Sequence, residues 1–513
     1  MQDCQLKADN PDSVRLAKGA AVALGGRVIG RTVDIISQVT LARLLPPEAF
    51  GVYAIGWTVF RMLGVTAALG LDNGVIHYAP RYWRSDNGGM KSVLLQAIGL
   101  AVFSGMMTGV GMYSVAPWLG ENVFHNAEVG RIIRWFSFAF FVYSGLKVVA
   151  VAITVSQKMQ YAAYAVDITQ PVVNWLLIVG LYAAGLGLSG AVAANICSFV
   201  VAFCLGCYYL KKLFPEVSIK QVRSVWMAGE LLVYSLPTLL AGTLTLCILW
   251  ADRLLAGYFL TPIEVGIYHA ASQLAMVFAS ILDAFGATFS PMIAHRFHRG
   301  QTKQLDELFK VSTKWGLYCS LPLFLVMVIA PQEVMEVLFG EQYVHGAPVL
   351  TILAISQLIN VGTGVASRLL ILTGHQNRWL LLSAVTLAVS VFLSLLMIPR
   401  FGLVGVALSS AGAMGGLFLA GLLQVRHSLA IWPYDGRYWK GMAAALITAG
   451  VLIGLHTVKI GAPALHLLLM TAASIGVFGV MLLAFGLDDE EQEFLTVTLL
   501  RYRTRSTVEP AQF

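Results

Sequence analysis

Long apolar blocks separated by short polar stretches dominate this sequence of 513 residues. A helix needs about 20 apolar residues to cross the hydrocarbon core of a bilayer. Only 12% of the residues are charged, against roughly 25% in soluble proteins. Transmembrane barrel strands are shorter and alternate in polarity. The sequence therefore predicts an all-α integral membrane protein with about fourteen transmembrane helices. The blocks cover residues 20–42, 50–71, 92–116, 135–155, 164–184, 188–210, 231–251, 266–290, 316–338, 348–373, 380–398, 402–424, 441–458 and 464–486.

The distribution of Lys and Arg predicts the orientation of these helices. With the N-terminus placed inside, 23 of the 34 basic residues fall in inner tails and loops. Six fall in outer loops or at outer helix ends, among them Arg43 and Arg253. Inner loops are the ones enriched in positive charge, so we expect both termini to be cytoplasmic. The first block has no cleavage site of the signal-peptide type and should remain as the first helix.

An internal repeat with an offset of 215 residues is visible along the chain. Gly51-Val52-Tyr53 corresponds to Gly266-Ile267-Tyr268, and Ala79, Arg81 and Arg84 correspond to Ala294, Arg296 and Arg299. Six helices lie in each unit, so both copies enter the membrane from the same side and form a parallel repeat. The expected layout is two six-helix bundles followed by two C-terminal helices. Its parts are an N-tail 1–19, a bundle 20–210, an inner linker 211–228, a bundle 229–425, helices 13 and 14 in 426–487, and a C-tail 488–513.

Motifs for nucleotide hydrolysis, zinc-dependent proteolysis and serine hydrolysis are missing from the sequence, which argues against these enzyme classes. The six cysteines are not arranged as a disulfide scaffold or a zinc site. Cys204 and Cys207 have the CxxC spacing, but no second ligand pair accompanies them, and helix packing is the better interpretation. The sequence predicts neither a cofactor nor a metal.

The first apolar block carries a polar stripe made of Arg27, Arg31, Asp34 and Gln38. The spacing of four, three and four places these side chains within about 60° of each other on a helix. Two interpretations are open. Arg31 could pair with Asp34 while Arg27 extends to the inner interface. Alternatively, the stripe forms one wall of a cationic cavity, because a single Asp cannot neutralise two Arg.

Other ionisable residues inside the apolar blocks are costly, at roughly 2.5–3.5 kcal/mol each on insertion scales, and usually face a cavity or a partner. Guanidinium groups suit phosphate oxygens. For Lys147 and Arg368 a purely structural pairing is an equal alternative. The candidate residues for binding an anionic substrate are Arg27, Arg31, Arg61, Lys147 and Arg368.

Three acids also lie within the blocks: Asp34, Asp167 and Asp283. Asp283 continues a polar face that contains Gln273 and Ser280. A carboxyl group in a membrane can carry a proton, and it can equally serve as the counter-ion of a nearby arginine. All three are candidates for ion coupling.

The segment Leu41-Ala42-Arg43-Leu44-Leu45-Pro46-Pro47-Glu48-Ala49-Phe50-Gly51-Val52-Tyr53 resembles the signature of Wzx-type polysaccharide flippases, and Ala251-Asp252-Arg253-Leu254-Leu255 resembles them too. These flippases belong to the MOP (MATE-like) exporter superfamily, and the resemblance covers roughly residues 15–486. It implies alternating access of two bundles around a cationic cavity. The implied activity is translocation of undecaprenyl-diphosphate-linked oligosaccharide from the cytoplasmic to the outer leaflet for surface polysaccharides such as lipopolysaccharide and exopolysaccharide.

The resemblance further implies a bacterial cytoplasmic (inner) membrane, and membrane lipids and a polysaccharide polymerase or export machinery as partners, with no nucleic acid. Two alternatives stay open. A MATE-like small-molecule antiporter would share the fold, although such exporters often bind cations through acids. A membrane glycosyltransferase or polymerase would be expected to have a sizeable outer loop with catalytic acids. The outer loops here are short, so the sequence predicts a transporter and not an enzyme.

Overall fold

The structure is a computed structural model and describes residues 11–83, 85–215, 226–458 and 461–486. Across these ranges the chain forms helices joined by short turns, and they contain no strand. The predicted all-helical class is therefore confirmed. The elements of the first half are α2 (Pro11–Leu44), α3 (Pro47–Ala67), α4 (Leu71–Tyr82), α5 (Asn87–Trp118), η1 (Leu119–Val123), α6 (Ala127–Phe136), η2 (Ser137–Ala139), α7 (Phe140–Val155), α8 (Met159–Ala162), η3 (Ala163–Thr169), α9 (Gln170–Ala183) and α10 (Gly187–Leu213). The elements of the second half are α11 (Ala228–Phe259), α12 (Pro262–His298), α13 (Thr302–Ile329), α14 (Pro331–Phe339), η5 (Glu341–Gly346), α15 (Ala347–Gly362), α16 (Ala366–Leu372), α17 (Gln376–Leu429), α18 (Tyr438–Thr457) and α19 (Pro463–Ala484).

Eleven helices of the described chain are long and apolar enough to cross a membrane, or twelve when the bent helix α11 is counted. This count treats α17 as one helix, although the non-helical backbone of Gly402 divides it. It also leaves out α2, which carries Arg27, Arg31 and Asp34. The number fourteen consequently stays a prediction, while the multi-pass helical architecture is established.

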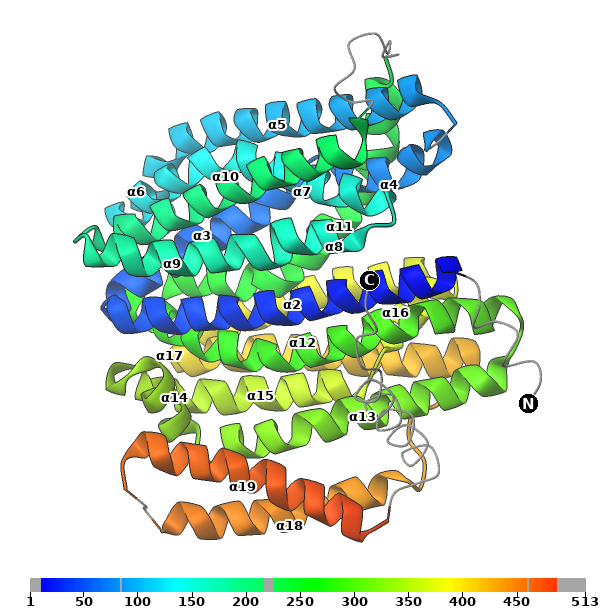
Figure 1. Cartoon of the computed structure of the whole chain (residues 1–513). Helices are drawn as coiled ribbons and strands as arrows, with labels where there is room; N and C mark the ends of the chain where they lie inside the picture. The colour runs from blue at the N-terminus through cyan, green and yellow to red at the C-terminus, as the bar shows by residue number, and fades with distance from the viewer. Residues whose placement is uncertain (1–10, 84, 216–225, 459–460, 487–513) are drawn as a thin grey trace, which may run out of the picture.

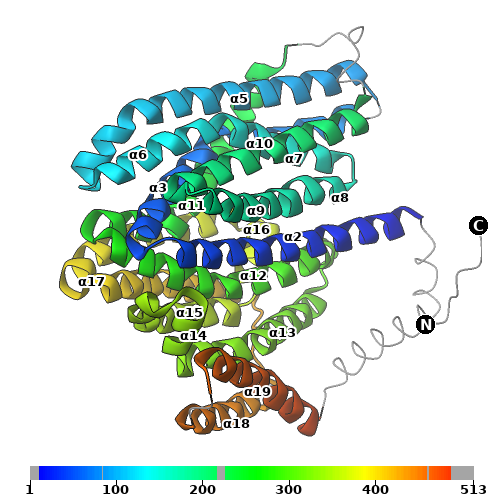
Figure 2. The ribbon, with the colours of Figure 1, turned by 60° about the vertical axis from the view of Figure 1, so that its left-hand side comes forward.

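Two groups of helices make up most of the molecule, and we name them by their residues (Figures 1 and 2). The N-lobe comprises α2–α10 and the C-lobe comprises α11–α17. Helix α2 runs along the boundary between them, packed against α9 and η3 on one side and α12 on the other. Helices α3 and α12 form the most extensive contact between the lobes, and α11 contacts α3 and α4 of the N-lobe. Helices α18 and α19 pack on α13 at the far edge of the C-lobe.

Several helices of the first half begin or end 215 residues before a helix of the second half does, which is the offset of the repeat in the sequence. Helices α2 and α11 end at Leu44 and Phe259, and α3 and α12 begin at Pro47 and Pro262. Helices α5 and α13 also begin 215 residues apart, at Asn87 and Thr302. These positions support the predicted repeat, whose parallel arrangement about an axis along the membrane normal stays a prediction.

Several predicted helices differ from the observed ones because composition does not register helix breaks. The block 316–338 contains the end of α13, Ala330 and the start of α14 at Pro331. Block 348–373 is divided between α15 and α16 by Gly364, whose φ of 60° would be strained for another residue and whose Cα lies against Thr313. Helix α11 continues to Phe259, two turns past the predicted end of its block at residue 251.

The boundaries of the expected tails and linker stay predictions. The predicted N-tail, 1–19, overlaps α2, which already begins at Pro11. In the predicted linker, 211–228, residues 216–225 lie outside the described residues, as does nearly all of the C-tail beyond residue 486.

Candidate functional site

Arg31 of α2 reaches across the boundary between the lobes. Its Nε donates to Ser280 Oγ of α12 at 3.3 Å, and its Nη2 lies 3.9 Å from Met276 Sδ of the same helix. The opposite face of α2 packs tightly on the N-lobe, because Gly30 lets the backbone approach the carbonyl of Asp167. The two faces together place the half-buried Arg31 guanidinium between the lobes.

Arg61 of α3 is the second arginine at this boundary. Its Nη1 donates to Tyr143 Oη at 3.4 Å. Its guanidinium carbon lies 5.6 Å from the ring centroid of Trp57 and 5.9 Å from that of Trp250 in α11. Both distances are within the range of cation–π attraction. Arg61 is therefore positioned by aromatic rings of both lobes, and it makes no ion pair with a carboxylate of the described chain.

Asp34 lies on α2 near both arginines. It is within electrostatic range of Arg31, Arg61 and Asp167. In the described part of the chain no hydrogen bond or close ion pair ties down its carboxylate. The pairing of Arg31 with Asp34 that we considered as a structural explanation of the stripe is thus not formed as a direct contact.

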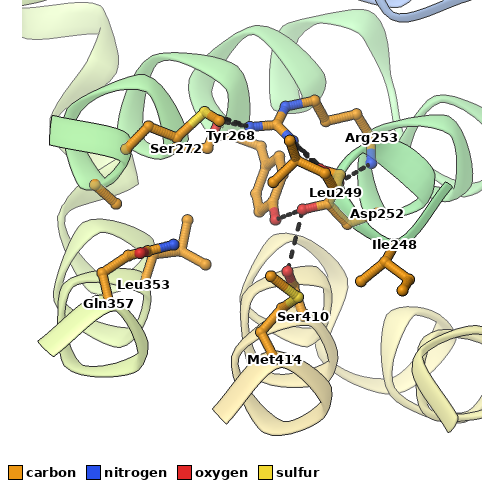
Figure 3. A pocket seen from close by; sticks show the side chains of 12 residues that line it. Ile248, Leu249, Asp252, Arg253, Tyr268, Ser272, Leu353, Gln357, Ser410 and Met414 are labelled. Atoms are coloured by element: carbon orange, nitrogen blue, oxygen red, sulfur yellow. Dashed lines mark hydrogen bonds and ion pairs between the residues drawn. The ribbon is translucent and has the colours of Figure 1, made fainter. Parts of the chain in front are cut away.

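A third arginine, Arg253, is buried in the C-lobe next to Asp252 (Figure 3). Its Nη1 lies 3.2 Å from Asp252 Oδ1, and its Nη2 donates to Ser272 Oγ at 3.0 Å. Tyr268 donates to Asp252 Oδ2 at 2.6 Å, and Ser410 donates to the same oxygen at 3.1 Å. A cavity of about 40 Å³ lies beside this group, enough for a few water molecules.

Met276 and Trp250 connect the three arginines. Met276 Sδ lies 3.9 Å from Arg31 Nη2 and 3.7 Å from Arg253 Nη2. The ring of Trp250 has Arg61 at 5.9 Å and Arg253 at 4.6 Å. We call Arg31, Arg61 and Arg253 the central arginine cluster. It joins α2 and α3 of the N-lobe to α11 and α12 of the C-lobe.

The other predicted cations lie apart from this cluster. Lys147 of α7 lies 3.9 Å from Asp72 of α4, inside the N-lobe. Arg368 of α16 forms an ion pair with Asp283 of α12 at 2.8 Å. Lys147 and Arg368 are thus each paired with an acid on another helix, and the spacing of residues along the sequence did not reveal these pairs.

Arg27 of α2 lies outside the central arginine cluster. Its side chain is exposed on α2. It lies within electrostatic range of Asp167 in η3. η3 is a π-helical segment, a local geometry that is frequent at functional sites. The two arginines of the predicted stripe therefore have different neighbours: Arg27 lies near Asp167, whereas Arg31 contacts α12.

We expected Arg253 at the outer end of its helix, but α11 continues beyond it to Phe259, and only 3% of the surface of Arg253 is exposed. The repeat could have revealed it. The offset of 215 maps the end of α2 at Leu44 onto Phe259, and it maps Ser37-Gln38 onto Asp252-Arg253.

No cluster of three His, Cys, Asp or Glu side chains that could hold a metal ion occurs in the described residues. The boundary between the lobes carries the guanidinium groups of Arg31 and Arg61, the carboxylate of Asp34 and the rings of Trp57 and Trp250. Such a set binds anions through charge-assisted hydrogen bonds.

Three relatives have matching sequences. An uncharacterized membrane protein of Methanocaldococcus jannaschii is 22% identical over 428 residues, 80% of this chain and 83% of its own length. The "probable low-salt glycan biosynthesis flippase Agl15" of Haloferax volcanii is 25% identical over 332 residues, 64% of this chain and 65% of its own length. The "probable lipid II flippase MurJ" of Bdellovibrio bacteriovorus is 26% identical over 239 residues, 43% of this chain and 44% of its own length.

Solved structures share the fold. The lipid II flippase MurJ in an inward closed conformation superposes with a TM-score of 0.72 at 12% identity, covering 90% of this chain and 97% of that one. An inward-facing MATE-family multidrug transporter of the MOP superfamily superposes with a TM-score of 0.64 at 17% identity, covering 80% and 98%. The family of polysaccharide biosynthesis proteins matches residues 40–348, more than half of the chain. This protein therefore belongs to the polysaccharide biosynthesis protein family and has the fold of the MOP superfamily.

Proposed function

We propose that this protein is a flippase that moves a polyprenyl-diphosphate-linked oligosaccharide from the cytoplasmic to the outer leaflet by alternating access. In a bacterial inner membrane the carrier would be undecaprenyl diphosphate, and the product would feed surface polysaccharide synthesis. The protein would act as a transporter and not as an enzyme. The relationship to a probable glycan flippase and a probable lipid II flippase supports this class of cargo.

The observation that carries the proposal is the unused hydrogen-bonding capacity of Arg31 and Arg61. A guanidinium has five N–H donors. The described contacts of Arg31 are one hydroxyl and one thioether, and those of Arg61 are one hydroxyl and two aromatic rings. Two forked cations in a partly buried position suit the oxygens of a diphosphate.

Charge balance links Asp34 to this site. Without cargo, the carboxylate of Asp34 offsets part of the charge of Arg31 and Arg61. A bound diphosphate brings negative charge to the same two arginines and repels an ionised Asp34. We therefore expect Asp34 to bind a proton when cargo binds. Asp167, close to Arg27 and to Asp34, is the second candidate for such a role. Asp283 is a weaker one because it already pairs with Arg368.

Transport by purified protein in liposomes tests the proposal. A short-chain, fluorescent diphosphate-linked oligosaccharide is added, and its appearance in the opposite leaflet is followed by quenching from outside. Wild-type protein should accelerate its translocation, and Arg31→Ala or Arg61→Ala should remove most of the acceleration. Arg31→Lys should restore part of it, because an ammonium keeps the charge without the planar fork.

Arg131→Ala provides a matched control, since Arg131 is exposed and pairs with Glu128 on its own helix. It should transport like wild type. Equal transport by wild type, Arg31→Ala, Arg61→Ala and Arg131→Ala would contradict the proposal. Extrusion of organic cations by the same vesicles, with no translocation of the glycan lipid, would favour the small-molecule antiporter instead.

A further inference from the structure

Arg43 connects the two lobes at the end of the molecule where α2 ends. Its Nε donates to the carbonyl of Leu338 at 2.9 Å. Its Nη2 donates to the carbonyl of Glu336 at 3.3 Å and also to that of Val337. These carbonyls form the last turn of α14 in the C-lobe. One side chain of the N-lobe therefore caps a helix of the C-lobe.

The chemistry of a helix end explains this contact. The last carbonyls of a helix have no donor within the helix and carry the negative end of its dipole. Helix α14 ends at Phe339, and the following Gly340, with a φ of 113°, turns the chain away. The guanidinium supplies the opposite charge and donates to the carbonyls of Val337 and Leu338, while the carbonyl of Glu336 accepts from Arg43 in addition to the N–H of Gly340. Because Arg43 is also in the last turn of α2, it is favourably placed for both helices.

A second hydrogen bond joins the same segments. Tyr343 is buried and donates from its hydroxyl to the carbonyl of Ala42 at 3.2 Å. A groove of about 480 Å³, lined by Arg43 and Glu341 among others, lies next to these bonds. Arg43 itself is exposed, so water can replace its hydrogen bonds when the lobes separate.

The repeat places a different residue at the equivalent position. The offset of 215 maps Arg43 onto Tyr258 of α11. The ring of Tyr258 lies 6.1 Å from His125, just after the π-helical segment η1 of the N-lobe. The two equivalent contacts lie at the same end of the molecule. One joins the Arg43 guanidinium to the carbonyls of α14, and the other joins the rings of Tyr258 and His125.

We propose that Arg43 and the last turn of α14 form a latch that holds the lobes together at this end and opens when cargo leaves. The charge distribution predicts that this end faces outward. The latch rests on the alternating-access function proposed above, since only such a cycle requires this end to open. The latch also gives a role to Arg43 within the segment Leu41–Tyr53, which resembles the signature of polysaccharide flippases.

Distance measurements between two spin labels test the latch without any cargo. In full-length protein without native cysteines, labels are attached at positions 48 and 342, which are exposed and lie on opposite lobes. The pulsed EPR distance distribution of the wild-type latch should have a single short population. Arg43→Ala should add a population at longer separation, and Arg43→Gln, which keeps donors but loses the charge, should add a smaller one.

Two further variants make the result decisive. Tyr343→Phe removes only the hydroxyl and should shift the distribution in the same direction as Arg43→Ala. Arg131→Ala removes another exposed arginine of the N-lobe and should leave it unchanged. Distributions in Arg43→Ala and Arg43→Gln that match wild type would overturn the latch.

The latch and the proposed function can fail separately. The distances are measured without glycan lipid, so an opened end in Arg43→Ala supports the latch even when no glycan lipid is transported. Loss of glycan-lipid transport in Arg31→Ala with an unaltered distance distribution would support the cargo site independently of the latch.

Discussion

Gly51 of α3 and Gly266 of α12 pack backbone to backbone across the boundary between the lobes. Each also lies against the proline at which the other helix begins, Gly51 against the carbonyl of Pro262 and Gly266 against that of Pro47. All four residues follow the offset of 215, so the contact is reciprocal. Close backbone approach of this kind needs residues without a side chain. The lobes therefore meet at a close backbone contact formed by two copies of one motif.

Gly51→Ala should destabilise the protein and reduce transport, because the added methyl group would overlap the carbonyl of Pro262. Overpacking of this kind costs about 1–3 kcal/mol. A thermal unfolding assay in detergent should show a lower midpoint. Gly180→Ala is the control, since no atom lies within 4 Å of the added methyl group. A midpoint for Gly51→Ala at or above that of Gly180→Ala would contradict the importance of this close contact.

Arg253→Met alone should be strongly destabilising, because it leaves Asp252 as a buried charge without its cation. Breaking a buried ion pair typically costs about 3–5 kcal/mol. The double variant Asp252→Ser with Arg253→Gln should be less affected, because the N-lobe has Ser37-Gln38 at the equivalent positions. Thermal unfolding of the single and double variants measures the difference. A double variant that is less stable than Arg253→Met would show that the equivalence does not hold.

Lys147→Met should lower the amount of folded protein in the membrane, because Asp72 loses its partner across α4 and α7. Combining it with Asp72→Asn should restore both protein level and transport. The measurement is a double-mutant cycle on thermal stability, with transport followed in parallel. Stable double-variant protein that no longer transports glycan lipid would instead place Lys147 in the path of the cargo.

Asp34→Asn should keep cargo binding and lose the dependence of binding on pH. In wild type a proton on Asp34 removes the negative charge near Arg31 and Arg61, so affinity for a diphosphate should rise as pH falls. By reciprocal linkage, bound cargo should favour the protonated form. Asn resembles the neutral acid and should hold the affinity at its low-pH value. Binding of the fluorescent cargo across a pH series measures this. A pH profile of Asp34→Asn that matches wild type would remove Asp34 from the coupling and direct attention to Asp167.

The class of the protein and its family follow from the amino-acid sequence alone. Apolar blocks of about 20 residues leave the chain no stable option in a bilayer except helices that satisfy their own backbone hydrogen bonds. The segment from Leu41 to Tyr53 was sufficient for the family, and the offset of 215 indicated the internal duplication. Spacing on one helix also identified Arg31 and Asp34 as neighbours, since residues three apart share a helical face.

Which of the charged residues have partners depends on the tertiary structure. Ser280 meets Arg31 across 249 positions of sequence, and the carbonyls of α14 meet Arg43 across more than 290. Such contacts depend on how helices cross and how their faces are turned. A single sequence does not specify crossing geometry, because many packings bury the same apolar surface. For that reason the sequence could not separate a structural role of Lys147 and Arg368 from a role in binding the substrate. In the structure Lys147 pairs with Asp72, and Arg368 pairs with Asp283. Arg31 and Arg61 instead retain free donors at the boundary between the lobes.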